Sequence, residues 1–189
     1  EPMYGYAERS LCSTLVEYGE KGVGEPNNRV LVRPQAILYR NSSVAKTHYR
    51  KSDRIEAKNL NESKVLYIPT TYVGNQIYGP FHSYEDHVYR EWHLALVEAI
   101  PSLTVKVHPK SNVELQPPGQ LERRWLDDCI NEYDVLIIDY MATSAVLSIV
   151  SDKPIIYFDI GLRRLSEGFE RDLLARCQYK RIDIKGNLG

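Results

Sequence analysis

Cysteine, tryptophan, methionine and phenylalanine are all scarce in this chain of 189 residues, and it has no long apolar run. The three cysteines, Cys12, Cys129 and Cys177, are an odd and scattered set without a CxxC pair. This spacing argues against a disulfide framework or a structural zinc site and is typical of a reducing cytosol. No apolar stretch approaches the roughly 18 residues that a membrane-spanning helix needs. The hydrophobic share of 43% and the net charge of -1 exclude a mostly disordered chain.

Charge is uneven along the chain, although it nearly cancels in total. Residues 29–64 hold nine basic and three acidic side chains, whereas the segments before and after this block are both net acidic. We interpret the basic block as a solvated surface, which is the usual role of such a run. The alternative is contact with an anionic partner, such as a phosphorylated polymer or a lipid headgroup.

From Lys64 onward, short apolar runs alternate with amphipathic segments. The apolar runs predict strands at 65–68, 103–107, 135–138, 154–158 and 179–184. The amphipathic segments predict helices at 83–100, 120–131, 143–150 and 163–176. Apolar strands separated by helices are typical of a parallel sheet covered on both faces. The sequence therefore predicts an α/β, Rossmann-like doubly wound domain over 64–189, which would bind ligands at the carboxyl ends of its strands.

The first 63 residues have a less regular pattern. We predict a helix over 8–20, short strands at 30–32 and 36–39, and a long polar loop over 41–63. This N-terminal helix and irregular basic segment are expected to pack on the lobe or to link to it. The chain starts with Glu1, and no signal-peptide pattern follows, so we expect a fragment or a processed protein.

Polar residues follow the second and third strands of the predicted domain. The second strand runs into His108 and Lys110, a pair suited to an anionic phosphate. The third runs through Asp139 to Thr143 and Ser144, where the next helix begins. The backbone N–H groups of that helix start, and the positive end of its dipole, would meet a phosphate there. The alternative is that Thr143 or Ser144 only caps the helix, and both interpretations stay open.

Four segments occur in an order that resembles a known group of transferases. They are Val65 to Thr70, Lys106 to Lys110, Asp134 to Ser144, and Lys153 to Asp159. They resemble the donor-binding C-terminal lobe of the GT-B transferases that build surface polymers. The nearest match is the CDP-glycerol glycerophosphotransferase (teichoic acid polymerase) family, whose relatives include capsule polysaccharide transferases. The resemblance covers residues 64–160, but Met141 and Ala142 stand where the family usually has serines directly after Asp-Tyr.

The resemblance implies a GT-B C-terminal-lobe type of fold, with a CDP-, CMP- or UDP-linked donor as substrate and with neither cofactor nor metal. It implies that the donor pyrophosphate meets His108, which we take as the catalytic residue. Carried over by position, Thr143 and Ser144 would meet the donor phosphates together with His108. The full set that we expect at the strand ends to bind the donor or its phosphates is Thr70, Thr71, Gly74, Asn75, Lys110, Asp139, Thr143, Ser144 and Asp159. Asp139 or Asp159 is expected to orient the loops or a ribose hydroxyl.

A GT-B enzyme also needs a second, N-terminal lobe, which this chain is too short to hold. The partners implied are therefore the nucleotide donor and that lobe or an acceptor polymer, with no nucleic acid. The implied location is the cytoplasm, with peripheral contact at the inner face of the cell membrane as an option. We expect this chain alone to bind nucleotide and to turn over little or nothing.

Two other functions stay open from the sequence. A sugar-nucleotide epimerase shares the same lobe architecture, and a non-catalytic binding module would keep the sheet without the donor site. No Asp-x-Asp metal motif and no GxGxxG dinucleotide motif occur in the chain. The spacing of His82, His87 and His93 does not place them on one helix face, so a zinc site is not expected. His87 and His93 are predicted to lie at the surface.

Overall fold

The described part of the chain forms two parallel sheets, one of two strands and one of six. The computed structural model describes residues 14–18, 29–33, 60–70, 86–109, 111, 118–151, 153–162, 165 and 167–184. In the small sheet, β1 (Thr14–Tyr18) pairs with β2 (Arg29–Arg33). The large sheet holds the candidate site.

Helices separate most of the strands of the large sheet along the chain. The strands are β3 (Val65–Ile68), β4 (Leu103–Lys106), β5 (Gln120–Glu122), β6 (Val135–Ile138), β7 (Ile155–Asp159) and β8 (Gln178–Arg181). The α-helices are α4 (Asp86–Ala99), α5 (Leu126–Cys129), α6 (Thr143–Val150) and α7 (Glu167–Arg176). A short 3-10 helix, η2 (Ile130–Glu132), continues α5. Among the described residues, no helix is long and apolar enough to cross a membrane.

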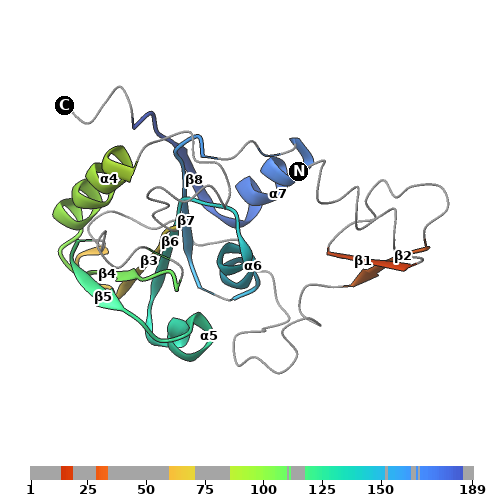
Figure 1. Cartoon of the computed structure of the whole chain (residues 1–189), viewed down its shortest axis with the longest axis horizontal. Helices are drawn as coiled ribbons and strands as arrows, with labels where there is room; N and C mark the ends of the chain where they lie inside the picture. Colours follow the sequence, from red (N-terminus) through yellow and green to blue (C-terminus); the bar gives the residue numbers. More distant parts are fainter. Residues whose placement is uncertain are drawn as a thin grey trace.

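The strand order of the large sheet is β5-β4-β3-β6-β7-β8, and all neighbouring strands are parallel. The chain moves outward from β3 to β4 and β5, then returns past β3 to β6 and continues to β7 and β8 (Figure 1). This is the strand order of a Rossmann-like fold, and its direction reverses between β3 and β6. A doubly wound sheet binds its ligands at such a reversal, in the crevice beyond the carboxyl ends of the two strands.

The sheet is buried on both faces, which explains its continuous apolar strands. Every residue of β3, β4 and β6 is buried. On one face, Tyr89, Trp92 and Leu96 of α4 pack against the strands, and on the other face α5, α6 and α7 contribute the apolar side chains. Figure 1 shows α4 and α6 on opposite sides of the sheet. The reversal of winding at β3 and β6 requires this, because the crossovers between parallel strands are right-handed.

Most of the predicted elements from residue 64 onward are confirmed. The strands at 65–68 and 135–138 and the helix at 143–150 have the predicted bounds, and the strands near 103–107, 154–158 and 179–184 shift by one to three residues. The helices predicted at 83–100 and 163–176 are present as α4 and α7. The starts predicted for them, at 83–85 and 163–166, fall largely outside the described residues.

Two predicted helices are wrong. Residues 120–131 begin as strand β5, which pairs in parallel with β4, and only Leu126–Cys129 is α-helical. Gly119 has φ +91°, a conformation that breaks a helix and turns the chain into the edge strand. A helix was also predicted over 8–20, but residues 14–18 form strand β1, whose backbone groups pair with those of β2. The strand predicted at 30–32 is confirmed within β2, and the one at 36–39 lies outside the described residues.

The buried side chain of Arg176, the last residue of α7, binds backbone carbonyl groups at the carboxyl end of α6. The guanidinium group of Arg176 donates to the carbonyl oxygens of Ile149 at 3.1 Å and of Ser151 and Lys153 at 2.8 Å each. The last carbonyls of a helix lack partners within the helix, so this side chain satisfies groups that would otherwise be buried without donors. The arginine thereby fixes α6 against α7 and β7.

We predict that Arg176→Met lowers the free energy of unfolding by about 2–4 kcal/mol, because three carbonyl oxygens lose a charged donor. Urea unfolding followed by circular dichroism measures the change. The matched control is Arg171→Met on the exposed face of the same helix, which should cost less than about 0.5 kcal/mol. Equal losses in the two variants would contradict this role of Arg176.

Candidate functional site

The carboxyl edge of the sheet gathers the described segments that were predicted to bind a ligand. Ile68 and Ile138 are paired at the ends of β3 and β6, so Thr70 and Tyr140 leave the sheet side by side. His108 follows β4, on the other side of β3. His108 and Thr143 follow consecutive strands of the predicted order, but these strands, β4 and β6, are not neighbours in the sheet, because β3 lies between them. Strand spacing puts the two strand axes roughly 10 Å apart, a distance that a bound diphosphate with its nucleoside can bridge.

The start of α6 lies at this edge and has no side-chain cap. The N-cap residue is Ala142, with extended backbone (φ -140°), and its methyl group accepts no hydrogen bond. The interpretation that Thr143 or Ser144 caps the helix is therefore wrong. The first helical bond runs from the Val146 N–H to the Ala142 carbonyl oxygen, so the N–H groups before it have no acceptor within the helix. Thr143 is exposed and Ser144 is half-buried, so both are placed to add to a binding surface.

Asp139, directly after β6, is buried beneath this edge, with 1% of its surface exposed. Its carboxylate accepts hydrogen bonds from the hydroxyl of Tyr67, from the hydroxyl of Tyr89 at 3.0 Å and from Nε1–H of Trp92 at 3.1 Å. The Tyr89 hydroxyl oxygen in turn accepts from the backbone N–H of Thr70 at 3.0 Å. Asp139 is therefore linked to Thr70, two residues beyond β3, through the hydroxyl group of Tyr89.

Burial governs the acid–base properties of this cluster. Desolvation raises the pKa of Asp139 to about 7, while the hydrogen bonds from Tyr67, Tyr89 and Trp92 act in the opposite direction. Burial, and then the charge of Asp139, raise the pKa of the Tyr67 and Tyr89 hydroxyls well above the ordinary value. Both tyrosines therefore stay protonated and act as hydrogen-bond donors.

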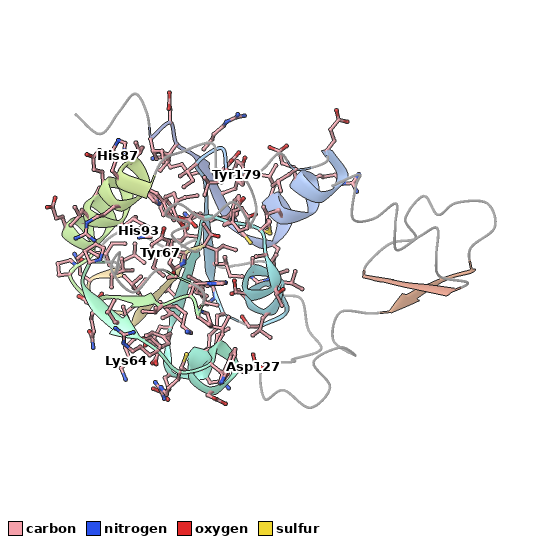
Figure 2. The ribbon with its side chains drawn as sticks, viewed as in Figure 1. Lys64, Tyr67, His87, His93, Asp127 and Tyr179 are labelled. Carbon is pink, nitrogen blue, oxygen red and sulfur yellow. The ribbon has the colours of Figure 1, made fainter. Side chains whose placement is uncertain are left out.

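His93 packs between the two tyrosines, although it was predicted to lie at the surface. It is fully buried, with ring centroids 4.9 Å from Tyr67 and 4.2 Å from Tyr89 in edge-to-face geometry. Figure 2 shows His93 beside Tyr67, between α4 and the sheet. Desolvation, followed by the charge of Arg90, lowers its pKa to about 3, so the ring is neutral. His87, one and a half turns earlier, is exposed as predicted.

Asp159 at the end of β7 organises the next loop. Its carboxylate accepts from the Gly161 backbone N–H at 3.0 Å and from the Tyr179 hydroxyl at 2.5 Å, and Arg181 Nε lies 3.9 Å away. Gly161 has φ +77°, a conformation that glycine adopts without strain. Asp159 is thus placed to hold the turn beyond β7, one strand from the start of α6.

His108 is placed by the pairing of β4 and β5. The Val107 N–H donates to the Glu122 carbonyl oxygen at 2.9 Å, and Lys106 Nζ donates to the Val107 carbonyl oxygen at 2.9 Å. Arg124 binds Glu122 and Glu132 at 2.6 Å each, and its hydrogen bonds lower the pKa of Glu122 to about 2. These bonds fix the strand ends, and His108 lies half-buried beyond them.

The described site residues thus fall into three groups. Thr70, Asp139, Thr143 and Ser144 lie around the reversal of the sheet, His108 lies beyond it on one side, and Asp159 lies beyond it on the other. The remaining predicted residues, Thr71, Gly74, Asn75 and Lys110, lie outside the described residues. Within the described ranges, no cluster of three or more histidine, cysteine or acidic side chains could hold a metal ion.

Sequence reasoning missed Tyr89 and misplaced the buried face of α4. The spacing of the apolar residues in this helix predicts a buried face of Val88, Trp92, Ala95, Leu96 and Ala99. Trp92 and Leu96 are buried as predicted, but Tyr89 and His93 complete the buried stripe, and Ala99 is exposed. Two features of the sequence could have indicated this buried polar cluster. They are the spacing of Tyr89, Trp92, His93 and Leu96, and the single tyrosine in the otherwise aliphatic run Val65–Ile68.

No known protein family model matches the chain, and neither the curated proteins nor the solved structures include one with significant similarity to it.

We predict that the two buried titratable groups change stability with pH in opposite directions. Because the pKa of Asp139 is raised in the folded state, its contribution is full below about pH 4 and is lost as pH rises to about 7. Because the pKa of His93 is lowered, its contribution is full above about pH 6.5 and is lost as pH falls toward 3.

Urea unfolding between pH 4 and 7 tests this. The stability difference between the wild-type protein and Asp139→Asn should shrink as pH rises, whereas the difference for His93→Phe should grow. Using differences removes the contributions of groups that all three proteins share, such as Glu122. Parallel pH profiles for the two variants would contradict the assignment.

Proposed function

We propose that this chain is the nucleotide-donor-binding lobe of a GT-B glycosyl- or glycerophosphotransferase that acts in the synthesis of a cell-surface polymer. The observation that carries the proposal is the start of α6, which has no side-chain cap and lies at the reversal of a Rossmann-like sheet. Helix starts of this kind bind phosphate, because their N–H groups and dipole face the anion. The motif order from Val65 to Asp159 supports the transferase class.

The proposed reaction is a substitution at the anomeric carbon or the phosphorus of the donor. An acceptor oxygen forms the new bond, the bond to the nucleotide phosphate oxygen breaks, and the nucleotide leaves with the electron pair. A base on the second lobe takes the acceptor proton. This chain contributes donors that face the leaving group, namely the N–H groups at the start of α6 and the side chain of His108, and these stabilise the growing negative charge.

The residues at the carboxyl edge have separate roles in this proposal. Thr143 and Ser144 add hydroxyl donors to the backbone N–H groups at the phosphate. His108 approaches from the β4 side, across the end of β3. Asp139 and Asp159 act on the protein, because their carboxylates accept hydrogen bonds from Tyr89 and from Gly161. The proposed site thus draws its phosphate affinity mostly from α6.

We predict that the chain binds one of CDP, CMP, UDP and GDP in an isothermal titration, and that His108→Ala weakens this binding about tenfold or more, because one donor to the diphosphate is lost. The nucleotide that binds best identifies the donor base. An absence of binding to all four would contradict the proposed function and would favour a non-catalytic module.

A second variant distinguishes a loss of phosphate binding from a loss of stability. Thr143→Asp places a carboxylate in the first turn of α6, where it interacts favourably with the helix dipole but repels a phosphate. We expect nucleotide binding to fall by about tenfold or more while the unfolding free energy stays the same or rises. The matched control is Asn131→Asp, which adds the same charge at an exposed position on η2. Equal binding by the two variants would exclude phosphate binding at α6.

A further inference from the structure

One hydroxyl group joins the two chain segments that leave the sheet at its reversal. The Tyr89 hydroxyl oxygen accepts from the Thr70 N–H at 3.0 Å and its O–H donates to the Asp139 carboxylate at 3.0 Å. Pro69 carries no N–H, so Thr70 offers the first backbone donor beyond β3. Asp139 is the first residue beyond β6. The Tyr89 side chain of α4 therefore connects Thr70, just beyond β3, with Asp139, just beyond β6.

We propose that Tyr89 is a positioning residue for nucleotide binding, which holds the Thr70 segment at a fixed place relative to the start of α6. The inference rests on the proposed function, because it takes the phosphate site to lie at that start. Tyr89 is 2% exposed and acts through Thr70 and Asp139. Its importance follows from the sensitivity of a binding site to displacements of about 1 Å in the segments that form it.

The substitution Tyr89→Phe removes this tie with little other change. The Thr70 N–H, in a residue that is 7% exposed, loses its acceptor, so the segment is expected to move until water reaches it. Asp139 keeps the donors of Tyr67 and Trp92. The phenylalanine ring keeps the edge-to-face contact with His93, and α4 keeps its packing against the sheet.

Tyr67→Phe is the matched control. The Tyr67 hydroxyl also donates to Asp139 from a fully buried position, but Thr70 is bound by Tyr89. Both variants thus lose one buried hydroxyl at the same carboxylate, and only Tyr89→Phe releases the Thr70 segment. A general loss of stability would affect the two variants alike, whereas a positioning role affects only one.

The experiment combines titration of CDP, CMP, UDP and GDP with hydrogen exchange of the Thr70 amide, measured by NMR. In Tyr89→Phe we expect affinity for the nucleotide that binds to fall about tenfold, with loss of protection at Thr70. In Tyr67→Phe we expect affinity within about twofold of the wild-type protein and a protected amide. Thr70→Pro removes the donor of the same bond and should weaken binding as much as Tyr89→Phe, which keeps the test available if that variant does not fold.

Two results would overturn the inference by itself. In one, the wild-type protein binds nucleotide and Tyr89→Phe binds it equally well. In the other, Tyr67→Phe weakens binding by the same factor, which would assign the effect to the stability of the whole cluster. A wild-type protein that binds none of the four nucleotides would overturn the proposed function, and this inference with it.

Discussion

The carboxyl edge of this sheet depends on the hydrogen bonds that the buried carboxyl group of Asp139 accepts. Burying an acid costs several kcal/mol unless donors surround it. Here Tyr67 of β3 and Tyr89 and Trp92 of α4 supply them, so three elements must meet at one point for the chain to fold. The same requirement places Thr70 and the start of α6, because one is bound by Tyr89 and the other follows Asp139 after three residues.

This arrangement connects the architecture to the proposed chemistry. Parallel strands bring their carboxyl ends to one edge, and the reversal of winding between β3 and β6 opens that edge to a ligand. Ala142 leaves the start of α6 without a side-chain cap. The helix start offers backbone donors there, and Thr143 and Ser144 follow directly. We propose a nucleotide-linked donor as the ligand of these groups.

The sequence predicted the sheet well and the polar cluster poorly. Short, wholly apolar runs such as Val135–Ile138 are typical of buried strands, and the polar residues 151–153 mark the end of α6. The Gln120–Glu122 strand was missed because its pairing with β4 is a long-range contact. The sequence also does not show that Gly119 adopts a positive φ and turns the chain into this strand. Tyr89 and His93 were missed because both count as polar, and only the fold shows that a buried acid and its donors make their burial favourable.

The most direct test of the central claim is to map the bound nucleotide by the amide NMR shifts of the protein on addition of CDP or of whichever nucleotide binds. The account predicts that the largest changes fall at Ala142, Thr143 and Ser144, with further changes at Thr70 and His108. Changes centred on α7, β8 or the opposite edge of the sheet, with the start of α6 unaffected, would contradict it.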